Sequence, residues 1–241
     1  MLKKIILIFL ICLSKFNCKE LPQIDLYFET ICPGCQYFIT GSFADFLNHP
    51  GHSELATVKF HPYGNAIEEK KGDLYEFTCQ HGENECYGNV IEVCALNKLP
   101  YEEGLNFILC MEKGIQKFQN DMNKALDNCL DSADLKKNIL DCAAGKEGND
   151  LQHKVAEGTP DHEYVPWITF EGEHDEKVQN KLMDDMVGFL CNLEDNIQKE
   201  ICVEVYKKKL SIEKNMIPKE KDYEVCKNVS FMKFADLKFL S

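Results

Sequence analysis

Residues 23–38 have the sequence QIDLYFETICPGCQYF. Apolar and polar residues alternate over 23–29 and aromatic residues are frequent there, a pattern that predicts a β-strand. From Gln36 to Leu47 the apolar residues recur at helical spacing, which predicts a helix. Cys32 and Cys35 therefore lie where a strand leads directly into a helix. A second predicted strand at 56–63 completes a strand–helix–strand unit.

The rest of the chain divides into a long helical stretch and a final strand and helix. Helices are predicted at 87–96, 101–111, 118–129, 135–142 and 150–156, with no further strand among them. Strand character returns at 163–170, and an amphipathic helix is predicted over 176–193. These elements predict an α/β protein with a thioredoxin-like fold, interrupted over about 66–160 by a cysteine-rich helical insertion. The predicted domain covers 19–202, and a lysine-rich C-terminal tail covers 203–241.

The first residues resemble a secretory leader. Lys3 and Lys4 precede an apolar run at 5–13, and small or polar residues follow at 14–18. This order is typical of a signal peptide, here predicted to cover 1–18. A membrane anchor is the alternative, but the apolar run is too short to cross a bilayer. We therefore expect a protein that is secreted or held in a lumen, with no membrane contact once the leader is removed.

Composition fits the same compartment. The chain contains 13 cysteines, which are useful as disulfides in an oxidising lumen and are rare in cytosolic proteins. The spacing does not fix their connectivity. The formal net charge of −13 disfavours nucleic acid as a partner. The candidates for structural disulfides are Cys79, Cys86, Cys94, Cys110, Cys129, Cys142, Cys191, Cys202 and Cys226.

The tail carries a possible modification site. Asn228 begins the only Asn-x-Ser/Thr sequence of the chain and is a candidate for N-glycosylation. Cys202 and Cys226 are candidates for anchoring the tail covalently.

The pair Cys32 and Cys35 has three interpretations. Half of a zinc site would need a second cysteine or histidine pair at ligand spacing, and the chain has none. Two unrelated structural cysteines are the second interpretation. A redox pair is favoured, because unpaired N–H groups at a helix N-terminus stabilise a thiolate. Cys32 is then the expected nucleophile with a lowered pKa, and Cys35 the more buried resolving thiol.

Val165 and Pro166 are the candidate substrate-binding residues. A proline at the start of a late strand in a thioredoxin-like chain predicts a cis peptide bond that faces the cysteine pair. The backbone beside it would pair with an extended segment of substrate. The alternative is an ordinary edge-strand proline.

Residues 79–94, CQHGENECYGNVIEVC, fit the pattern C-Q-H-G-x-x-E-C-x-x-N-x(4)-C. This segment resembles the signature of the gamma-interferon-inducible lysosomal thiol reductase family. We call residues 79–94 the signature segment. The resemblance implies a thioredoxin fold with a helical insertion, and reduction of protein disulfides at acid pH in endosomes or lysosomes.

The resemblance also implies roles for individual residues. It makes Cys32 the nucleophile and Cys35 the resolving cysteine, and the signature segment itself is not expected to be the catalytic site. Within that segment the cysteines are expected to form disulfides, and His81 to form local hydrogen bonds rather than to bind a metal. Mammalian members have removable terminal segments, so 203–241 is a candidate prosegment.

The expected function is thiol–disulfide exchange. The expected partners are disulfide-containing protein substrates and a small-thiol reductant such as cysteine or glutathione. No nucleotide or flavin motif occurs in the sequence, so no organic cofactor is expected, and no metal is expected either. One alternative is a secretory-pathway oxidase or isomerase, because the Pro-Gly linker does not fix the direction of exchange. The other is a non-catalytic, disulfide-stapled binding protein, although the cysteine spacing does not match a saposin-like module.

Overall fold

The computed structural model describes residues 20–193, 200–203, 205 and 207. The predicted signal peptide, Cys226 and Asn228 lie outside the described residues, as does most of the tail. None of the helices in the described part of the chain has the length and apolar character needed to cross a membrane.

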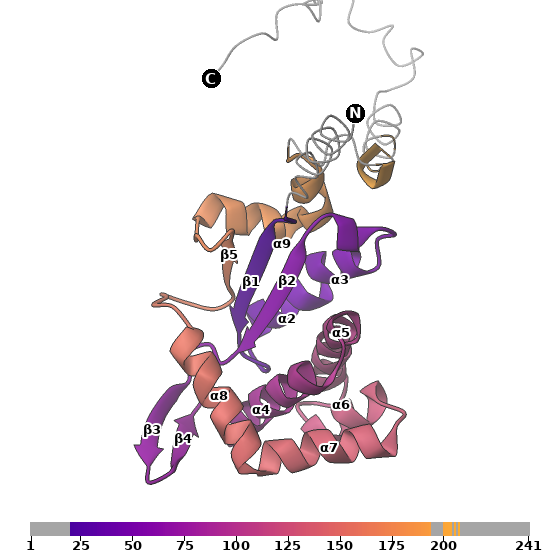
Figure 1. The fold of residues 1–241 in the computed structure, drawn as a ribbon. Coiled ribbons are helices and arrows are strands. Elements are labelled where there is room, and N and C mark those ends of the chain that lie inside the picture. The colour runs from indigo at the N-terminus through magenta and orange to yellow at the C-terminus, as the bar shows by residue number, and fades with distance from the viewer. Residues whose placement is uncertain (1–19, 194–199, 204, 206, 208–241) are drawn as a thin grey trace, which may run out of the picture.

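A three-stranded sheet forms one half of the molecule (Figure 1). β1 (Gln23–Phe28) lies in the centre, β2 (Thr57–Pro62) pairs with it in parallel, and β5 (Trp167–Phe170) pairs antiparallel on its other side. The sheet is accompanied by α2 (Pro33–Thr40), α3 (Ser42–Leu47), the 3₁₀ helix η1 (His52–Glu54) and α9 (Glu176–Cys191). We call these elements the sheet region.

Ser42 explains how α3 docks on α9. The single helix predicted over 36–47 is in fact two helices, α2 and α3, which meet at Gly41. The Ser42 hydroxyl then donates to the Leu182 carbonyl oxygen at 2.7 Å and accepts from the Met186 amide at 2.8 Å. Because a helix normally joins these two backbone groups directly, the inserted hydroxyl accounts for the non-helical backbone at Asp185 within α9.

The other half contains the predicted helical insertion. Its helices are α4 (Glu83–Lys98), α5 (Tyr101–Lys117), α6 (Met122–Cys129), α7 (Ala133–Ala144) and α8 (Lys146–Gly158). We call residues 67–158 the helical region. In Figure 1 it lies below the sheet region, and α5 contacts both α2 and α3.

The prediction of no further strand in this stretch was wrong. β3 (Ile67–Lys71) and β4 (Leu74–Thr78) form an antiparallel hairpin, with Gly72 at a positive φ in its turn. Charged residues fill most of β3 and both strands are largely exposed, so the alternation of apolar residues is too weak to reveal them. The Asn149 side chain holds the hairpin to α8 through two hydrogen bonds with the backbone of Tyr75.

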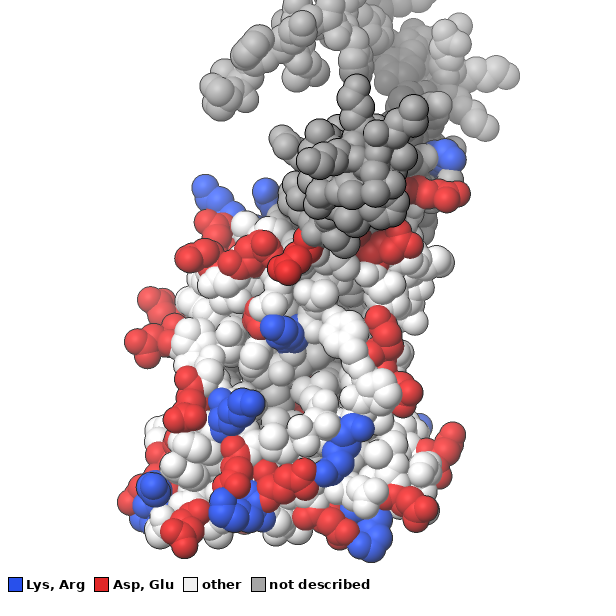
Figure 2. All heavy atoms as spheres, in the orientation of Figure 1, with Lys and Arg blue, Asp and Glu red and all other residues white. Residues whose placement is uncertain are grey.

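Four disulfides join eight of the nine cysteines predicted to be structural. The helical region contains Cys79–Cys86, Cys94–Cys142 and Cys110–Cys129, and Cys191–Cys202 follows α9. Cys32 and Cys35 are free. On the face drawn in Figure 2, acidic and basic side chains are interspersed over the described residues, and acidic ones are the more frequent.

Candidate active site

The start of α2 places the two free cysteines. Cys32 is the residue that caps the helix, and Pro33 occupies the first turn, where its missing N–H is not needed. The Cys32 Sγ accepts a hydrogen bond from the Cys35 amide at 3.4 Å. Cys32 is 7% exposed and Cys35 is fully buried, so only the first thiol is within reach of a partner.

The two thiols have opposite proton affinities. A hydrogen bond from the Cys35 thiol, resisted by burial and aided by backbone N–H groups and the charge of His81, lowers the pKa of Cys32 to about 6. Burial, together with the hydrogen bond to Cys32 and its charge, raises the pKa of Cys35 well above its ordinary value. Because the thiolate is the nucleophilic form, the lowered pKa favours Cys32 as the nucleophile, whereas the raised pKa keeps Cys35 protonated.

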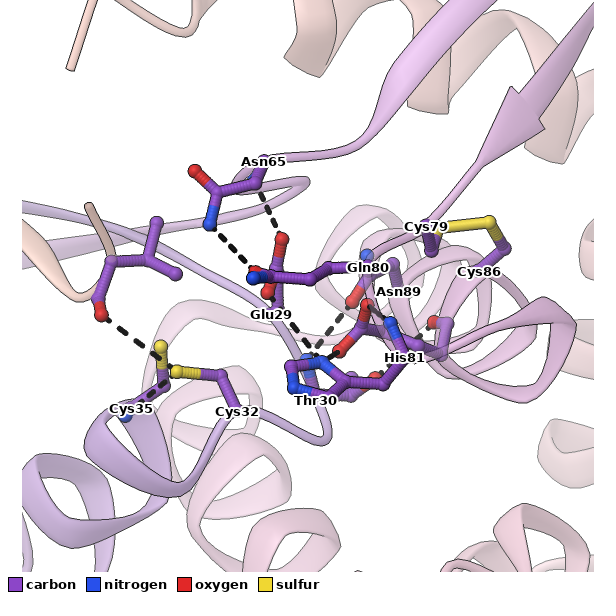
Figure 3. A network of polar contacts seen from close by, with 12 residues as sticks. Glu29, Thr30, Cys32, Cys35, Asn65, Cys79, Gln80, His81, Cys86 and Asn89 are labelled. Carbon is purple, nitrogen blue, oxygen red and sulfur yellow. Dashed lines mark hydrogen bonds and ion pairs between the residues drawn. A yellow bond between two sulfur atoms is a disulfide. The ribbon is translucent and has the colours of Figure 1, made fainter. Parts of the chain in front are cut away.

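The predicted substrate-binding residues lie against this pair. The Val165–Pro166 peptide bond is cis, as the sequence predicted. The Val165 carbonyl oxygen is 3.8 Å from the Cys32 Sγ (Figure 3). A Cβ on Gly34 would lie 3.2 Å from the Pro166 Cδ, so the linker between the cysteines packs directly on the proline.

The signature segment packs against Thr30, two residues before Cys32. The Thr30 amide donates to the Asn89 side chain at 3.1 Å, and the Thr30 hydroxyl donates to the Glu85 carbonyl oxygen at 3.2 Å. A Cβ on Gly88 would lie 2.6 Å from the Thr30 hydroxyl, so a glycine is needed for this close approach. The cysteine spacing predicts disulfides in the segment but does not show what the start of α4 packs against.

His81 forms the predicted local hydrogen bonds and one further ion pair. Its amide donates to the Glu85 Oε1 at 2.9 Å, and its Nδ1 lies 2.5 Å from the Glu85 Oε2. Burial alone would lower the pKa of His81, but the hydrogen bond and charge of Glu85, with the charge of Glu29, raise it. The Nδ1 is also 3.8 Å from the Glu29 Oε2.

Glu29 directly follows β1, three residues before Cys32, and its side chain is fully buried. Its Oε1 accepts a hydrogen bond from the Asn65 amide at 2.6 Å, whereas its Oε2 has no hydrogen-bond partner. Burial, followed by the charge of Glu85, raises the pKa of Glu29 to about 7. A carboxyl group that is neutral at acid pH therefore lies between the signature segment and the reactive thiol.

Comparison with known proteins gives the same assignment as the signature segment. Residues 23–133 match the family described as Gamma interferon inducible lysosomal thiol reductase (GILT). A Carassius auratus protein named gamma-interferon-inducible lysosomal thiol reductase is 36% identical over 208 residues, which are 81% of this chain and 77% of that protein. A Mus musculus protein of the same name is 35% identical over 191 residues, 75% of this chain and 71% of that protein.

The match extends to plants. An Arabidopsis thaliana protein named gamma-interferon-responsive lysosomal thiol protein is 34% identical over 180 residues, which are 70% of each chain. This chain belongs to the GILT family. The family's relatives in fish and mouse are named thiol reductases, so the GILT assignment makes this chain a disulfide oxidoreductase.

Two further acidic residues of this GILT chain were missed by the sequence analysis. Glu92 on α4 and Glu112 on α5 are fully buried, and neither carboxyl group has a hydrogen-bond partner among the described residues. Burial raises the pKa of both well above the ordinary value, and the charge of Glu112 contributes to the raised pKa of Cys35. The sequence offered one sign that Glu92 is buried, because it lies between the apolar residues Ile91 and Val93, which are buried with it on α4.

Proposed function

We propose that this GILT-family chain has a thioredoxin-like fold and reduces protein disulfides through Cys32 and Cys35. The observation that carries the proposal is the state of the cysteines. Of the ten in the described part of the chain, eight are paired in disulfides, and the free two lie at a helix N-terminus with opposite proton affinities. The central position of β1 and the cis peptide bond beside Cys32 support the thioredoxin-like fold.

The proposed cycle has two exchanges. The Cys32 thiolate attacks one sulfur of a substrate disulfide, forming a mixed disulfide while the other substrate sulfur leaves and takes a proton from solvent. Cys35 then loses its proton and attacks the Cys32 Sγ, which releases the second substrate thiol and leaves a Cys32–Cys35 disulfide. The substrate gains two electrons and the enzyme loses two. A small thiol such as cysteine or glutathione restores the enzyme through two further exchanges and becomes a disulfide itself.

The proposed working place is acidic, in endosomes or lysosomes or after secretion. At pH 5 a thiol with a pKa of about 6 is roughly one-tenth thiolate, whereas an ordinary cysteine is roughly one part in 3,000 thiolate. The names of the fish and mouse relatives, which include the word lysosomal, support the same compartment. An extended substrate segment would pair with the backbone at Val165, beside the attacking sulfur.

Reduction of insulin at pH 4.5 and pH 7, with small thiol present, tests this function. We expect the wild type to reduce insulin at pH 4.5. Cys32→Ser should lose at least about a thousandfold in rate, because the other free cysteine of the described residues, Cys35, is fully buried and has a raised pKa. Cys35→Ser should accumulate a mixed disulfide with substrate, visible as a mass increase that reductant removes. Unchanged activity in Cys32→Ser would refute the assignment, and activity only at pH 7 would favour the secretory-pathway oxidoreductase instead.

A further inference from the structure

His81 and Glu85 have no role in the exchange cycle as written, although they lie beside its nucleophile. They enter the site from the signature segment, and Glu29 enters it from the end of β1. The three side chains offer atoms that all lie within 4.8 Å of one another. Figure 3 shows Glu29 and His81 between the cysteine pair and the Cys79–Cys86 disulfide.

The loop after β2 closes over Glu29. Gly64 adopts a φ of +57°, and a Cβ at that position would lie 2.3 Å from the Glu29 Cγ. The next amide, from Asn65, fixes the Oε1. The Glu29 Oε2 has no hydrogen-bond partner and lies 3.8 Å from the His81 Nδ1. A proton or a positive charge on the imidazole ring can therefore compensate this buried oxygen.

The surrounding charges single out His81. The ionisable groups that act on Glu29 and the two thiols are Glu85 and His81 from the signature segment, Glu112 from α5, and the thiols themselves. Of these groups only His81 is basic. Its positive charge lowers the pKa of Cys32. The charge of Cys32 raises the pKa of Glu29 and of Glu112, so a negative charge on either carboxyl group opposes the thiolate.

We propose that Glu29, His81 and Glu85 form a proton-holding triad that sets the reactivity of Cys32. Glu85 orients a protonated His81, which favours the Cys32 thiolate, and Glu29 opposes the thiolate once it ionises. These are positioning residues, because they act through Cys32. The inference rests on the proposed function only in taking Cys32 as the attacking thiol.

The distances fit a shared proton better than a metal ion. Two ligands on a tetrahedral zinc ion with bonds of about 2.0 Å lie roughly 3.3 Å apart. The His81 Nδ1 and the Glu85 Oε2 are 2.5 Å apart, so they are hydrogen-bonded to each other and too close to be two ligands of one ion. The same pair would have to separate before it could hold one ion.

The triad predicts the shape of the Cys32 titration. The pKa of Cys32 is about 6 and that of Glu29 about 7, and each negative charge disfavours the other. The two groups therefore titrate as a coupled pair. The fraction of Cys32 in the thiolate form rises over a wider pH range, which extends toward alkaline pH. Replacement of Glu29 by a neutral residue should give a sharper titration at lower pH, whereas loss of the His81 charge should move it to higher pH.

The test is the rate at which iodoacetamide alkylates Cys32 between pH 3.5 and 9, read from the Cys32 peptide by mass spectrometry. The full chain is used with Cys32 and Cys35 reduced by a mild small thiol. We expect His81→Gln to raise the Cys32 titration by about one pH unit, which lowers alkylation at pH 5 about tenfold. Glu29→Gln should move the curve the opposite way, and Glu85→Gln should resemble His81→Gln with a smaller shift.

His153→Gln is the matched control. His153 forms the same kind of pair, with its Nδ1 2.8 Å from Glu68 of β3, but its partners lie in the hairpin and α8 rather than beside Cys32. We expect its alkylation curve to overlay that of the wild type. Circular dichroism of each variant separates an altered titration from misfolding, and the opposite shifts of His81→Gln and Glu29→Gln cannot both arise from loss of structure.

Two outcomes would overturn the triad. One is an alkylation curve for His81→Gln that matches those of the wild type and His153→Gln. The other is protection of Cys32 by added Zn²⁺ in the wild type but not in His81→Gln, which would make the cluster a metal site. The proposed function fails separately: a low Cys32 titration without insulin reduction would leave the triad standing and remove the reductase.

Discussion

The sheet region and the helical region use cysteine in opposite ways. Three disulfides cross-link the helical region. The sheet region carries two free thiols at the start of α2, and its one disulfide among the described residues, Cys191–Cys202, lies at the end of α9. The sheet region packs instead around fully buried aromatic side chains, among them Phe28, Phe38 and Phe43. In the helical region several helices are short and highly charged, such as α6 and α7, and each buries only two or three residues.

The difference teaches where covalent support is needed. A core of large aromatic side chains stabilises the sheet region around Cys32 and Cys35, which remain free and available for the proposed exchange. Short charged helices bury less apolar surface and gain more from cross-links. The helical region in turn supplies the residues that surround the thiols, namely the signature segment and Glu112.

Removal of the Cys94–Cys142 disulfide is the strongest way to break this comparison. The two residues are 48 apart, so the cross-link restricts a long loop in the unfolded chain and stabilises the fold by about 4 kcal/mol. We expect Cys94→Ser with Cys142→Ser to lose about that free energy of unfolding, measured by urea titration. Cys79→Ser with Cys86→Ser is the control, because a separation of only 7 predicts about 2 kcal/mol. A loss under 1 kcal/mol for the long loop would mean that packing, not cross-linking, holds the helical region.

The Glu92–Glu112 pair sharpens the comparison through pH. Both carboxyl groups have an ordinary pKa of 4.5 and a raised pKa in the folded protein. Between pH 4.5 and the raised pKa, the folded state therefore binds more protons than the unfolded state. Stability is then full below pH 4.5 and falls as pH rises, by about 1.4 kcal/mol per pH unit for each group that stays protonated. We expect the wild type to melt at a higher temperature at pH 4.5 than at pH 7.5.

Glu112→Gln identifies the source of that pH dependence. An amide keeps a donor beside Glu92 and removes one of the two titrating groups, so the difference in melting temperature between pH 4.5 and 7.5 should shrink. Glu103→Gln, an exposed change on the same helix, should leave the difference as in the wild type. Equal pH dependence in all three proteins would contradict this assignment and show that other groups dominate it.

Gly34→Ala has the smallest predicted effect and tests the part of the sheet region that carries the two free thiols. Alanine favours the helix by about 1 kcal/mol over glycine, but its Cβ would lie 3.2 Å from the Pro166 Cδ and 4.0 Å from the Cys32 Sγ. We expect the melting temperature to be unchanged or slightly higher, while insulin reduction at pH 4.5 falls severalfold because the proline must shift by a few tenths of an ångström. A parallel loss of stability and activity would contradict this separation.

Much of the site was predictable because its signals are local. The strand and the helix at residues 23–47 place Cys32 and Cys35, and Val165-Pro166 precedes a recognisable strand. The residues that surround the thiols were not predictable in the same way. Glu29 appears in the sequence as an ordinary charge at a strand end, and only the loop at Gly64 and Asn65 makes it a buried one.

The long-range parts of the fold were missed for a similar reason. The apolar alternation that predicts strands is absent from β3 and β4, which are held by Asn149 of α8 rather than by a buried face. The spacing of the signature cysteines predicts disulfides, but the contact of α4 with Thr30 depends on one missing side chain, at Gly88. Burial of Glu92 and Glu112 arises only when α4 and α5 face each other.

β1 and β5 pair in the folded protein but are synthesised at different times. Ile24 lies opposite Phe170, and Val165, whose carbonyl oxygen is 3.8 Å from the Cys32 Sγ, precedes β5, so the two halves of the proposed active site leave the ribosome far apart in time. At about 5–20 residues per second the interval between them is on the order of 10 s. During it, Cys32 and Cys35 are already made, and all of the cysteines that form the three disulfides of the helical region appear one after another. All six of these cysteines are therefore present in the nascent chain while Cys32 and Cys35 still lack the strand that later packs beside them.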